Sequence, residues 1–452
     1  MGLHYSSVVD APLAEVFAWH DRPGALPRLL PPWQPIKVAQ EAQSLADGRA
    51  VLQLPGHVRW VAQHSGDDPP YRFVDELVSL PLHWRHTHSF ETVDGGGTRV
   101  IDDVDTPVPG SFLRQTFRFR HHQLTGDLAA HRSAAQRGGP LLAIAVTGSS
   151  GLIGSALCAY LSTGGHRVIR LVRRPPRDAS ERTWDPARPD PRALEGIDAI
   201  VHLAGASIAG RFTDAHKRLV RDSRVGPTSE LARVLATMPD GPRILVCASG
   251  IGFYGSAGGD ELITEESRRG TGFLAEVVEA WEMAALPAVH AGVRVVHVRT
   301  GIVQSARGAS LKLLRPLFSV GLGGPLAPGS QWVSWIGLDD LLDVFGWALA
   351  DDEVVGPLNA VAPGAVTNAE YASTLARVMR RPALLKVPAF GPQVLLGAEG
   401  AREMVQASQR VAPARLAAAG HVFRHPSLEV CLRHQLGHID VAPFREESGN
   451  II

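Results

Sequence analysis

The sequence predicts an α/β protein in which a doubly wound parallel sheet with a small C-terminal subdomain follows an α+β domain. The first observation is an apolar run, Leu141–Val146, followed by glycines at three-residue spacing and a helical segment. The second is the alternation of strand-like and helix-like segments after residue 141, which is typical of a parallel sheet with helices on both faces. The third is a group of strand-like stretches before residue 135. Because 452 residues exceed one compact core, two or three domains are expected.

The N-terminal stretch, residues 1–135, has the pattern of an antiparallel sheet and one long helix. Strand His4–Val9 precedes a short helix that Asp10 and Pro12 introduce. Asp94–Gly97 predicts a hairpin turn, and residues 111–135 form a long amphipathic stretch. Further strands are expected at Ala50–Leu54, Val58–Ser65, Tyr71–Leu80, Trp84–Val93 and Thr98–Thr106. This order resembles the helix-grip fold of START-like, polyketide-cyclase-type domains, and the resemblance implies a hydrophobic ligand held between sheet and helix.

The glycine turn has the features of a dinucleotide-binding site. Gly148, Gly151 and Gly154 stand between a buried strand and a helix, which is the context that a Rossmann-type phosphate-binding turn requires. Glycine permits unusual backbone dihedral angles and a close approach of the pyrophosphate, and the helix N-terminus stabilises the phosphate charge. We therefore assign cofactor binding to Thr147, Gly148, Ser150, Gly151, Leu152, Ile153 and Gly154.

The domain boundaries follow from these patterns. The small, polar, Gly- and Pro-containing residues 136–140 predict a linker. The Rossmann domain is expected at 141–300, interleaved with a substrate subdomain at 301–440, where the pattern loosens into Gly- and Pro-rich loops. Residues 441–452 are expected to form a tail. Parallel strands are predicted at Leu141–Val146, Val168–Val172, Ala199–Leu203, Arg243–Ala248 and Val293–Arg299.

The residues after the second parallel strand favour NADP as the cofactor. Val172 stands where NAD-specific Rossmann domains usually have an acidic residue, and Arg173 and Arg174 follow it. An arginine suits bidentate contact with a 2′-phosphate, so NADPH is favoured over NADH; the alternative is two exposed arginines without that role. Small residues at the next strand end extend the site to Leu203, Ala204 and Gly205. Arg224 either braces this cleft or forms a surface ion pair.

Further stretches identify a family resemblance. They are TGSSGLIG (147–154), HLAGASIAGRFT (202–213), KRLVRDSRV (217–225), SGIGFYG (249–255), FLAEVVEAWE (273–282), VRTGIV (298–303), GGPLAPGSQWVSWI (323–336), NAVAPGAVTNAEY (359–371), PALLKVPAF (382–390) and SQRVAPARLAAAGHVFRHP (408–426). In this order, over residues 141–436, they resemble the extended short-chain dehydrogenase/reductase superfamily and, more narrowly, its atypical YfcH-like epimerase family. The resemblance implies an NADP-dependent oxidoreductase or epimerase.

The chain departs from that superfamily in its acid–base residues. Typical members use a Tyr-x-x-x-Lys pair, in which the lysine lowers the pKa of the tyrosine. None of the five tyrosines here has a lysine four residues on, and Val277 and Val278 stand where the lysine is expected. Ser249 keeps the position of the catalytic serine and is assigned to polarising a carbonyl. Tyr254 is the second catalytic candidate, either as a proton donor or as an aromatic wall beside the nicotinamide.

Histidines gather in the N-terminal domain. His86 and His88 share one face of a strand, and His121 and His122 lie on the helix that follows. No cysteine and no ordered set of carboxylates accompanies them, so no metal site is assigned. We interpret them as polar decoration of a strand or as hydrogen-bonding groups inside a ligand cavity. A solvated strand end is expected for Asp102, Asp103 and Asp105.

Composition argues against several kinds of partner. Lysine plus arginine and aspartate plus glutamate number 45 each, so nothing predicts binding to nucleic acid or to an anionic membrane. No run of apolar residues is long enough to predict a membrane span. Cys158, Cys247 and Cys431 lie far apart in the sequence, so no disulfide framework is expected. Free cysteines favour the reducing cytoplasm as the location. The oligomeric state is left open, with a homodimer among the alternatives.

Two functional hypotheses follow. The first is an NADP(H)-dependent epimerase or reductase that acts on a small carbonyl, hydroxyl or sugar-type substrate, and it depends on the cofactor site and Ser249. The second is a catalytically silent NADPH-binding sensor or scaffold coupled to a hydrophobic-ligand-binding N-terminal domain. The second hypothesis depends on the missing tyrosine–lysine pair.

Overall fold

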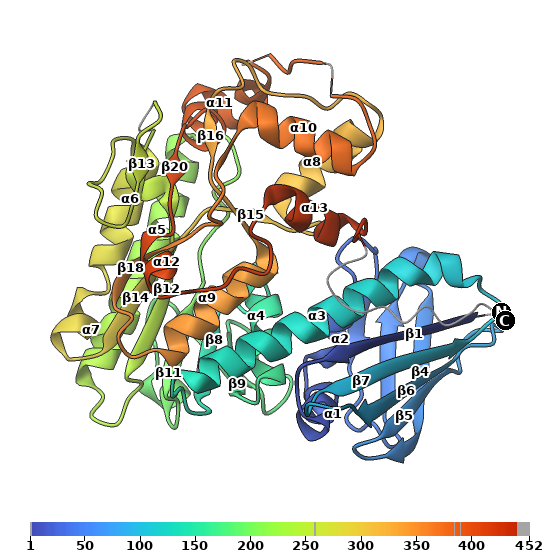
Figure 1. The fold of residues 1–452 in the computed structure, drawn as a ribbon. Coiled ribbons are helices and arrows are strands. Elements are labelled where there is room, and N and C mark those ends of the chain that lie inside the picture. The colour runs from blue at the N-terminus through green and yellow to red at the C-terminus, as the bar shows by residue number, and fades with distance from the viewer. Residues whose placement is uncertain (1, 257–258, 384, 389, 441–452) are drawn as a thin grey trace. The chain divides into compact units, whose positions relative to one another are not determined.

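The computed structural model describes residues 2–256, 259–383, 385–388 and 390–440, and it contains two compact units (Figure 1). The first unit contains the residues up to Gln136, together with Cys158–His166 and the described residues from Arg433 on. The second contains Arg137–Leu157 and Arg167–Leu432. The tail predicted at 441–452 lies outside the described residues.

The first unit is built on a seven-stranded antiparallel sheet in the order β1-β7-β6-β5-β4-β3-β2. Its strands are β1 (Gly2–Val9), β2 (Lys37–Gln40), β3 (Arg49–Gln53), β4 (Arg59–Asp68), β5 (Arg72–Leu77), β6 (Arg85–Thr92) and β7 (Thr98–Asp105). Its helices include α1 (Leu13–Asp21), α2 (Ala25–Leu29) and α3 (Gly110–Gln136), with a 3-10 turn at Pro55–His57. Leu124 and Leu128 of α3 share a buried core with Phe73 and Phe90 of the sheet. The predicted α+β arrangement of sheet and long helix is therefore confirmed.

Asp102 corrects one expectation for this unit. Its side chain is buried inside the sheet-and-helix core rather than at a solvated strand end. The reason is that its carboxylate accepts hydrogen bonds from His86 Nε2 at 2.9 Å and from His121 Nε2 at 2.8 Å. Asp103 and Asp105 point away from this core and are exposed, as expected.

The second unit contains a seven-stranded parallel sheet in the order β10-β9-β8-β11-β12-β14-β18. Its strands are β8 (Ala143–Thr147), β9 (Arg167–Val172), β10 (Glu181–Thr183), β11 (Ala199–His202), β12 (Ile244–Gly250), β14 (Arg294–Thr300) and β18 (Gly356–Ala360). Numbered along the chain, this order is 3-2-1-4-5-6-7, which confirms the doubly wound prediction. The order reverses between β8 and β11, and ligands of such sheets bind at the carboxyl ends of the strands flanking that point.

Helices and short strands complete the second unit. The helices are α5 (Asp214–Thr237), α6 (Phe273–Met283), α7 (Leu286–His290), α8 (Ala309–Ser319), α9 (Leu338–Ala350), α10 (Asn368–Val378), α11 (Gly391–Met404) and α12 (Ala414–Ala418), with 3-10 turns at Pro191–Leu194 and Ile251–Tyr254. Helices α4 (Leu152–Thr163) and α13 (Leu428–Leu436) each have residues in both units. The short strands are β13 (Leu262–Ile263), β15 (Ile302–Gln304), β16 (Trp332–Val333), β17 (Trp335–Gly337), β19 (Val366–Thr367) and β20 (Arg410–Val411). Within the described part of the chain, no helix is long and apolar enough to cross a membrane.

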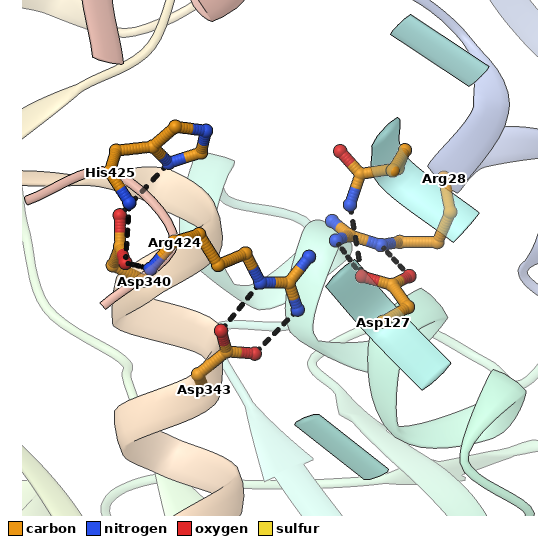
Figure 2. A network of polar contacts seen from close by, with 7 residues as sticks. Arg28, Asp127, Asp340, Asp343, Arg424 and His425 are labelled. Atoms are coloured by element: carbon orange, nitrogen blue, oxygen red, sulfur yellow. Dashed lines mark hydrogen bonds and ion pairs between the residues drawn. The ribbon is translucent and has the colours of Figure 1, made fainter. Parts of the chain in front are cut away.

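Each unit contains buried ion pairs that join segments far apart in the sequence (Figure 2). In the first unit, the Arg28 guanidinium donates to both oxygens of Asp127 at 2.8 and 2.6 Å. In the second, Arg424 donates to both oxygens of Asp343 on α9 at 2.5 and 2.6 Å. Charges removed from water in this way need a partner, and each pair connects two segments that are far apart in the sequence.

Candidate functional site

The glycine turn lies at the carboxyl end of β8, where the strand order of the parallel sheet reverses. Gly148 has a φ of 66°, and a Cβ there would lie 2.9 Å from the carbonyl of Leu203. A Cβ at Gly154 would lie 2.2 Å from the Gly148 oxygen. Both positions therefore require glycine for close backbone contacts. Gly151 is exposed, and the nearest atom to a Cβ there would be the same oxygen at 3.3 Å, so this side of the turn is open.

Thr147 connects the turn to the end of β11. Its Oγ1 accepts hydrogen bonds from the backbone N–H groups of Leu203 and Ala204 at 3.1 and 3.2 Å. His202 Nδ1 lies 2.9 Å from the same oxygen, within hydrogen-bond distance. Burial lowers the pKa of His202 to about 4, so the ring is neutral near pH 7. The backbone of residues 203–204 is thereby fixed beside the glycine turn.

The structure distinguishes the two arginines that follow β9. Arg174 donates to both oxygens of Glu181 at 2.7 and 2.6 Å, so its guanidinium is already occupied by a carboxylate. Arg173 is exposed and forms no hydrogen bond or ion pair with any described residue. Because a 2′-phosphate needs an available cation, Arg173 is the stronger candidate of the two.

Arg224 lies on α5 beside the predicted ribose-binding backbone. A Cβ at Gly205 would lie 3.2 Å from Arg224 Cζ, and the guanidinium donates to the Val220 carbonyl at 3.0 Å. It also stacks 5.2 Å from the ring centre of Trp281, and burial lowers its pKa to about 10. Within the described residues it has no acidic partner. Its role in bracing the cofactor cleft stays a prediction.

Ser249, at the carboxyl end of β12, is linked to a buried ion pair. Its hydroxyl donates to Glu282 Oε1 at 2.7 Å. Arg299 donates to the same carboxylate through Nε and Nη2 at 2.8 and 2.7 Å. Burial alone would raise the pKa of Glu282, but the hydrogen bonds and charge of Arg299 hold it below its usual value. The carboxylate is therefore ionised, and Ser249 presents its oxygen lone pairs, rather than its hydrogen, to other groups.

Tyr254 is held by the same network. Its hydroxyl donates to Asn359 Oδ1 at 2.7 Å and accepts from Arg299 Nη1 at 3.0 Å. The side chain is only 3% exposed, and burial raises its pKa in spite of the arginine. A tyrosine that donates protons in catalysis needs the opposite shift. Its roles as a proton donor and as an aromatic wall both stay predictions.

Helix α6 begins next to a carboxylate that comes from another helix. The backbone N–H groups of Phe273 and Leu274 donate to the carboxylate of Glu403, on α11, at 2.8 and 2.7 Å. Val277 and Val278 are buried. The carboxylate of Glu403 thus caps the helix, and its negative charge interacts favourably with the positive N-terminal end of the helix dipole.

Four residues of these networks are not predicted from the sequence: Glu282, Arg299, Asn359 and Glu403. The first three lie within stretches that carry the family resemblance, in FLAEVVEAWE, VRTGIV and NAVAPGAVTNAEY. The available signal was a charged residue within or beside an apolar run, namely Glu282 at the end of one stretch and Arg299 near the start of the next. Their pairing could not be read from the sequence, because α6 and β14 meet only in the folded sheet.

Comparison with known proteins gives two family matches. Residues 144–359 match the NAD dependent epimerase/dehydratase family, and residues 387–435 match a domain of unknown function, DUF1731. An epimerase family protein from Mycobacterium bovis is 42% identical over 288 residues, which is 63% of this chain and 94% of that protein.

Two solved structures extend the similarity. The crystal structure of a nucleoside-diphosphate sugar epimerase from Corynebacterium glutamicum has a TM-score of 0.86 and 40% identity, over 97% of this chain and 91% of that one. Human epimerase family protein SDR39U1 (isoform 2), solved with NADPH, has a TM-score of 0.61 and 31% identity, over 66% of this chain and 100% of that one. With the doubly wound sheet and the glycine turn, these similarities show that the chain belongs to the epimerase family and carries an NAD-dependent epimerase/dehydratase domain.

Proposed function

We propose that the chain binds NADP(H) at the glycine turn of β8 and uses it as an oxidoreductase or epimerase on a small hydroxyl, carbonyl or sugar-type substrate. The observation that carries the proposal is the open side of the turn at Gly151, next to the start of α4, at the point where the strand order reverses. NADPH in the human relative favours the phosphorylated cofactor, and so does Arg173, which has no hydrogen-bond or ion-pair partner among the described residues.

Ser249 is the group that would contact the reacting atoms of the substrate. The cofactor supplies or accepts a hydride when bound. Because Ser249 donates its hydroxyl hydrogen to Glu282, it is arranged to accept a hydrogen bond from a substrate hydroxyl. The ionised Glu282 fixes this polarity, and Arg299 holds Glu282 in place. The arrangement therefore favours an alcohol or sugar hydroxyl as the group that binds at Ser249.

The test is a hydride-transfer assay with cofactor binding measured in parallel. Nucleotide sugars, secondary alcohols and carbonyl compounds are incubated with the protein and NADP⁺ or NADPH. Absorbance of the reduced nicotinamide reports net oxidation or reduction, and NMR of the products reports epimerisation, which leaves the cofactor in its starting oxidation state. We expect turnover that Ser249→Ala abolishes while NADPH affinity is retained. Turnover no faster than in buffer, with the cofactor demonstrably bound, would contradict the enzymatic proposal.

A cofactor-binding sensor without turnover is the second candidate. It is supported by Tyr254, whose hydroxyl is engaged by Asn359 and Arg299 and whose pKa is raised. In that case the protein binds NADPH, no substrate is turned over, and Ser249→Ala changes neither property. Nicotinamide-dependent turnover lost on Ser249→Ala would exclude the sensor.

A hydrophobic ligand in the first unit is a separate proposal, which the START-like resemblance supports. The supporting feature is the antiparallel sheet with α3 packed on its inner face. The test is binding of a lipophilic fluorophore and its displacement by fatty acids or polycyclic aromatics. Saturable displacement supports a ligand cavity, and fluorescence no higher than with a globular control protein removes the idea.

A further inference from the structure

A cluster of titratable side chains lies in the first unit, apart from the residues assigned to the cofactor. Asp75 of β5 is paired in register with His86 of β6, and His88 of β6 is paired with Asp102 of β7. Alternate residues of a strand share a face, so His86 and His88 point to the same side. His121 of α3 approaches from the helix. His86, His88, Asp102 and His121 are each 3% exposed.

We propose that Asp75, His86 and His88 form a binding site for a divalent transition-metal ion. One ligand atom from each of the three lies within 4.8 Å of the others. Asp75 Oδ2 is 3.3 Å from His86 Nδ1 and 3.2 Å from His88 Nε2. Ligand atoms bound to one zinc ion at about 2.0–2.1 Å in tetrahedral geometry are about 3.3–3.4 Å apart. The separations from Asp75 therefore match a metal site without rearrangement of the backbone.

The other ring nitrogens of the two histidines meet one carboxylate. His86 Nε2 and His88 Nδ1 each lie 2.9 Å from Asp102 Oδ1. Metal-binding histidines commonly donate their second N–H to a carboxylate, which fixes the tautomer and the ring orientation. Asp102 is held in turn by His121 Nε2 at 2.8 Å, and His121 Nδ1 lies 2.6 Å from Ser7 Oγ. The cluster thus contains both the ligands and the groups that orient them.

The charges of the cluster also suit a cation. Asp75 and Asp102 contribute two negative charges in a largely buried place, where unbalanced charge is costly. A divalent ion bound by neutral imidazoles balances the two carboxylates. Two imidazoles and one carboxylate favour zinc, iron, cobalt or nickel over magnesium and calcium, which prefer oxygen ligands.

Three protein ligands leave a coordination position for another molecule. Structural zinc sites usually have four protein ligands, whereas three are typical of sites that bind water or a substrate. Aromatic rings surround the site: Phe73 stacks on His88 at 4.1 Å between ring centres, and Phe117 lies edge-on to His86 at 5.2 Å. The fourth position is therefore available to a water molecule or to another small oxygen or nitrogen donor.

The direct test uses the full, untagged chain after removal of metals with a chelator. Zn²⁺ is titrated by calorimetry, and Co²⁺ is titrated by visible absorption, which reports imidazole ligation. We expect one equivalent per chain, with affinity reduced about 100-fold or more in Asp75→Asn and in His88→Gln. The matched control is His83→Ala. His83 is an exposed histidine near the same strand, and among the described residues it pairs only with the exposed Asp105. It should bind zinc like the parent.

Two results would overturn the proposal: no stoichiometric binding by the parent chain, or equal affinity in the parent, Asp75→Asn and His88→Gln. Folding of each variant is checked by circular dichroism. Should a variant fail to fold, anomalous diffraction from zinc-soaked crystals of the parent decides. A peak between Asp75, His86 and His88 supports the site, and a peak only elsewhere, or none, contradicts it.

Discussion

At the scale of single residues, the account separates Arg173 from Arg174. The two are neighbours, but Arg174 is held by Glu181, whereas Arg173 has no described partner. The sequence predicted two cations at the end of β9 and could not tell which one was available, because Glu181 belongs to β10, which was not predicted. The difference matters for cofactor choice, since only an available guanidinium can bind a 2′-phosphate.

Arg173→Ala should reduce the preference for NADPH over NADH. We expect NADPH affinity to fall about 10- to 100-fold, because a hydrogen bond to a charged group contributes about 1.5–3 kcal/mol, while NADH affinity changes little. Fluorescence titration with each cofactor measures both. Arg174→Ala is the control and should keep most of the preference. An unchanged preference in Arg173→Ala would show that another residue contacts the 2′-phosphate.

Tyr254→Phe distinguishes a structural hydroxyl from a catalytic one. Removing the hydroxyl leaves Asn359 Oδ1 and Arg299 Nη1 each without a buried partner. We expect the free energy of unfolding to fall by about 1–3 kcal/mol in urea, with NADPH affinity retained. Tyr71→Phe, at an exposed tyrosine, should change neither. Turnover lost at unchanged stability would instead support the proton-donor role.

His202 should make stability depend on pH. Its pKa is about 4 in the fold and about 6.5 when unfolded, so the unfolded chain binds the extra proton between these values. Stability therefore falls as pH drops from about 6.5 to about 4, by about 3 kcal/mol at 1.4 kcal/mol per pKa unit. In His202→Asn the urea midpoint should vary less over this range. The exposed His290→Asn is the control, and equal pH dependence in both variants would contradict the assignment.

At the scale of elements, the three glycines of the β8–α4 turn have different tasks. Gly148 and Gly154 allow close backbone contacts inside the turn, whereas Gly151 is exposed and a Cβ there would meet only the Gly148 oxygen, at 3.3 Å. The glycine spacing predicted the turn, since each glycine stands where a strand passes into a helix. It could not show which glycine serves the ligand and which serves the fold, because that depends on the carbonyl positions.

Gly151→Val should therefore reduce cofactor binding, whereas Gly154→Ala should reduce the stability of the fold. A valine at 151 fills the space proposed for the pyrophosphate, so NADPH binding should be lost with the melting temperature nearly unchanged. An alanine at 154 forces its Cβ against the Gly148 oxygen, and we expect a loss of roughly 1–3 kcal/mol in unfolding free energy. Titration calorimetry and thermal unfolding measure the two effects. NADPH affinity preserved in Gly151→Val would refute this placement.

The strands of the parallel sheet could be predicted from the sequence at its centre but not at its edges. The five apolar runs at the centre of the parallel sheet were predicted because buried strands are rich in Val, Ile and Leu. Strand β18, with the sequence GPLNA, and the three-residue β10 carry no such signal. Both lie at edges of the sheet, where pairing with one neighbour decides the conformation more than the residue types do.

At the scale of the whole molecule, the sequence predicted the two kinds of sheet but not the polar groups that converge within them. Asp75 and Asp102 come from the strands on either side of β6, which carries His86 and His88. The sequence around the histidines therefore does not show the carboxylates that complete the cluster. The same holds for Ser249, Glu282 and Arg299, which come from β12, α6 and β14. Long-range pairing, rather than local pattern, makes these sites.

The central claim is that the family's cofactor site is intact in this chain and prefers NADPH. A fluorescence titration of the full chain with NADPH and, separately, with NADH decides this. The account predicts saturable, micromolar binding of NADPH and distinctly weaker binding of NADH. Absence of binding by either cofactor would contradict the claim of an intact site, and equal affinity for both would contradict the role of Arg173.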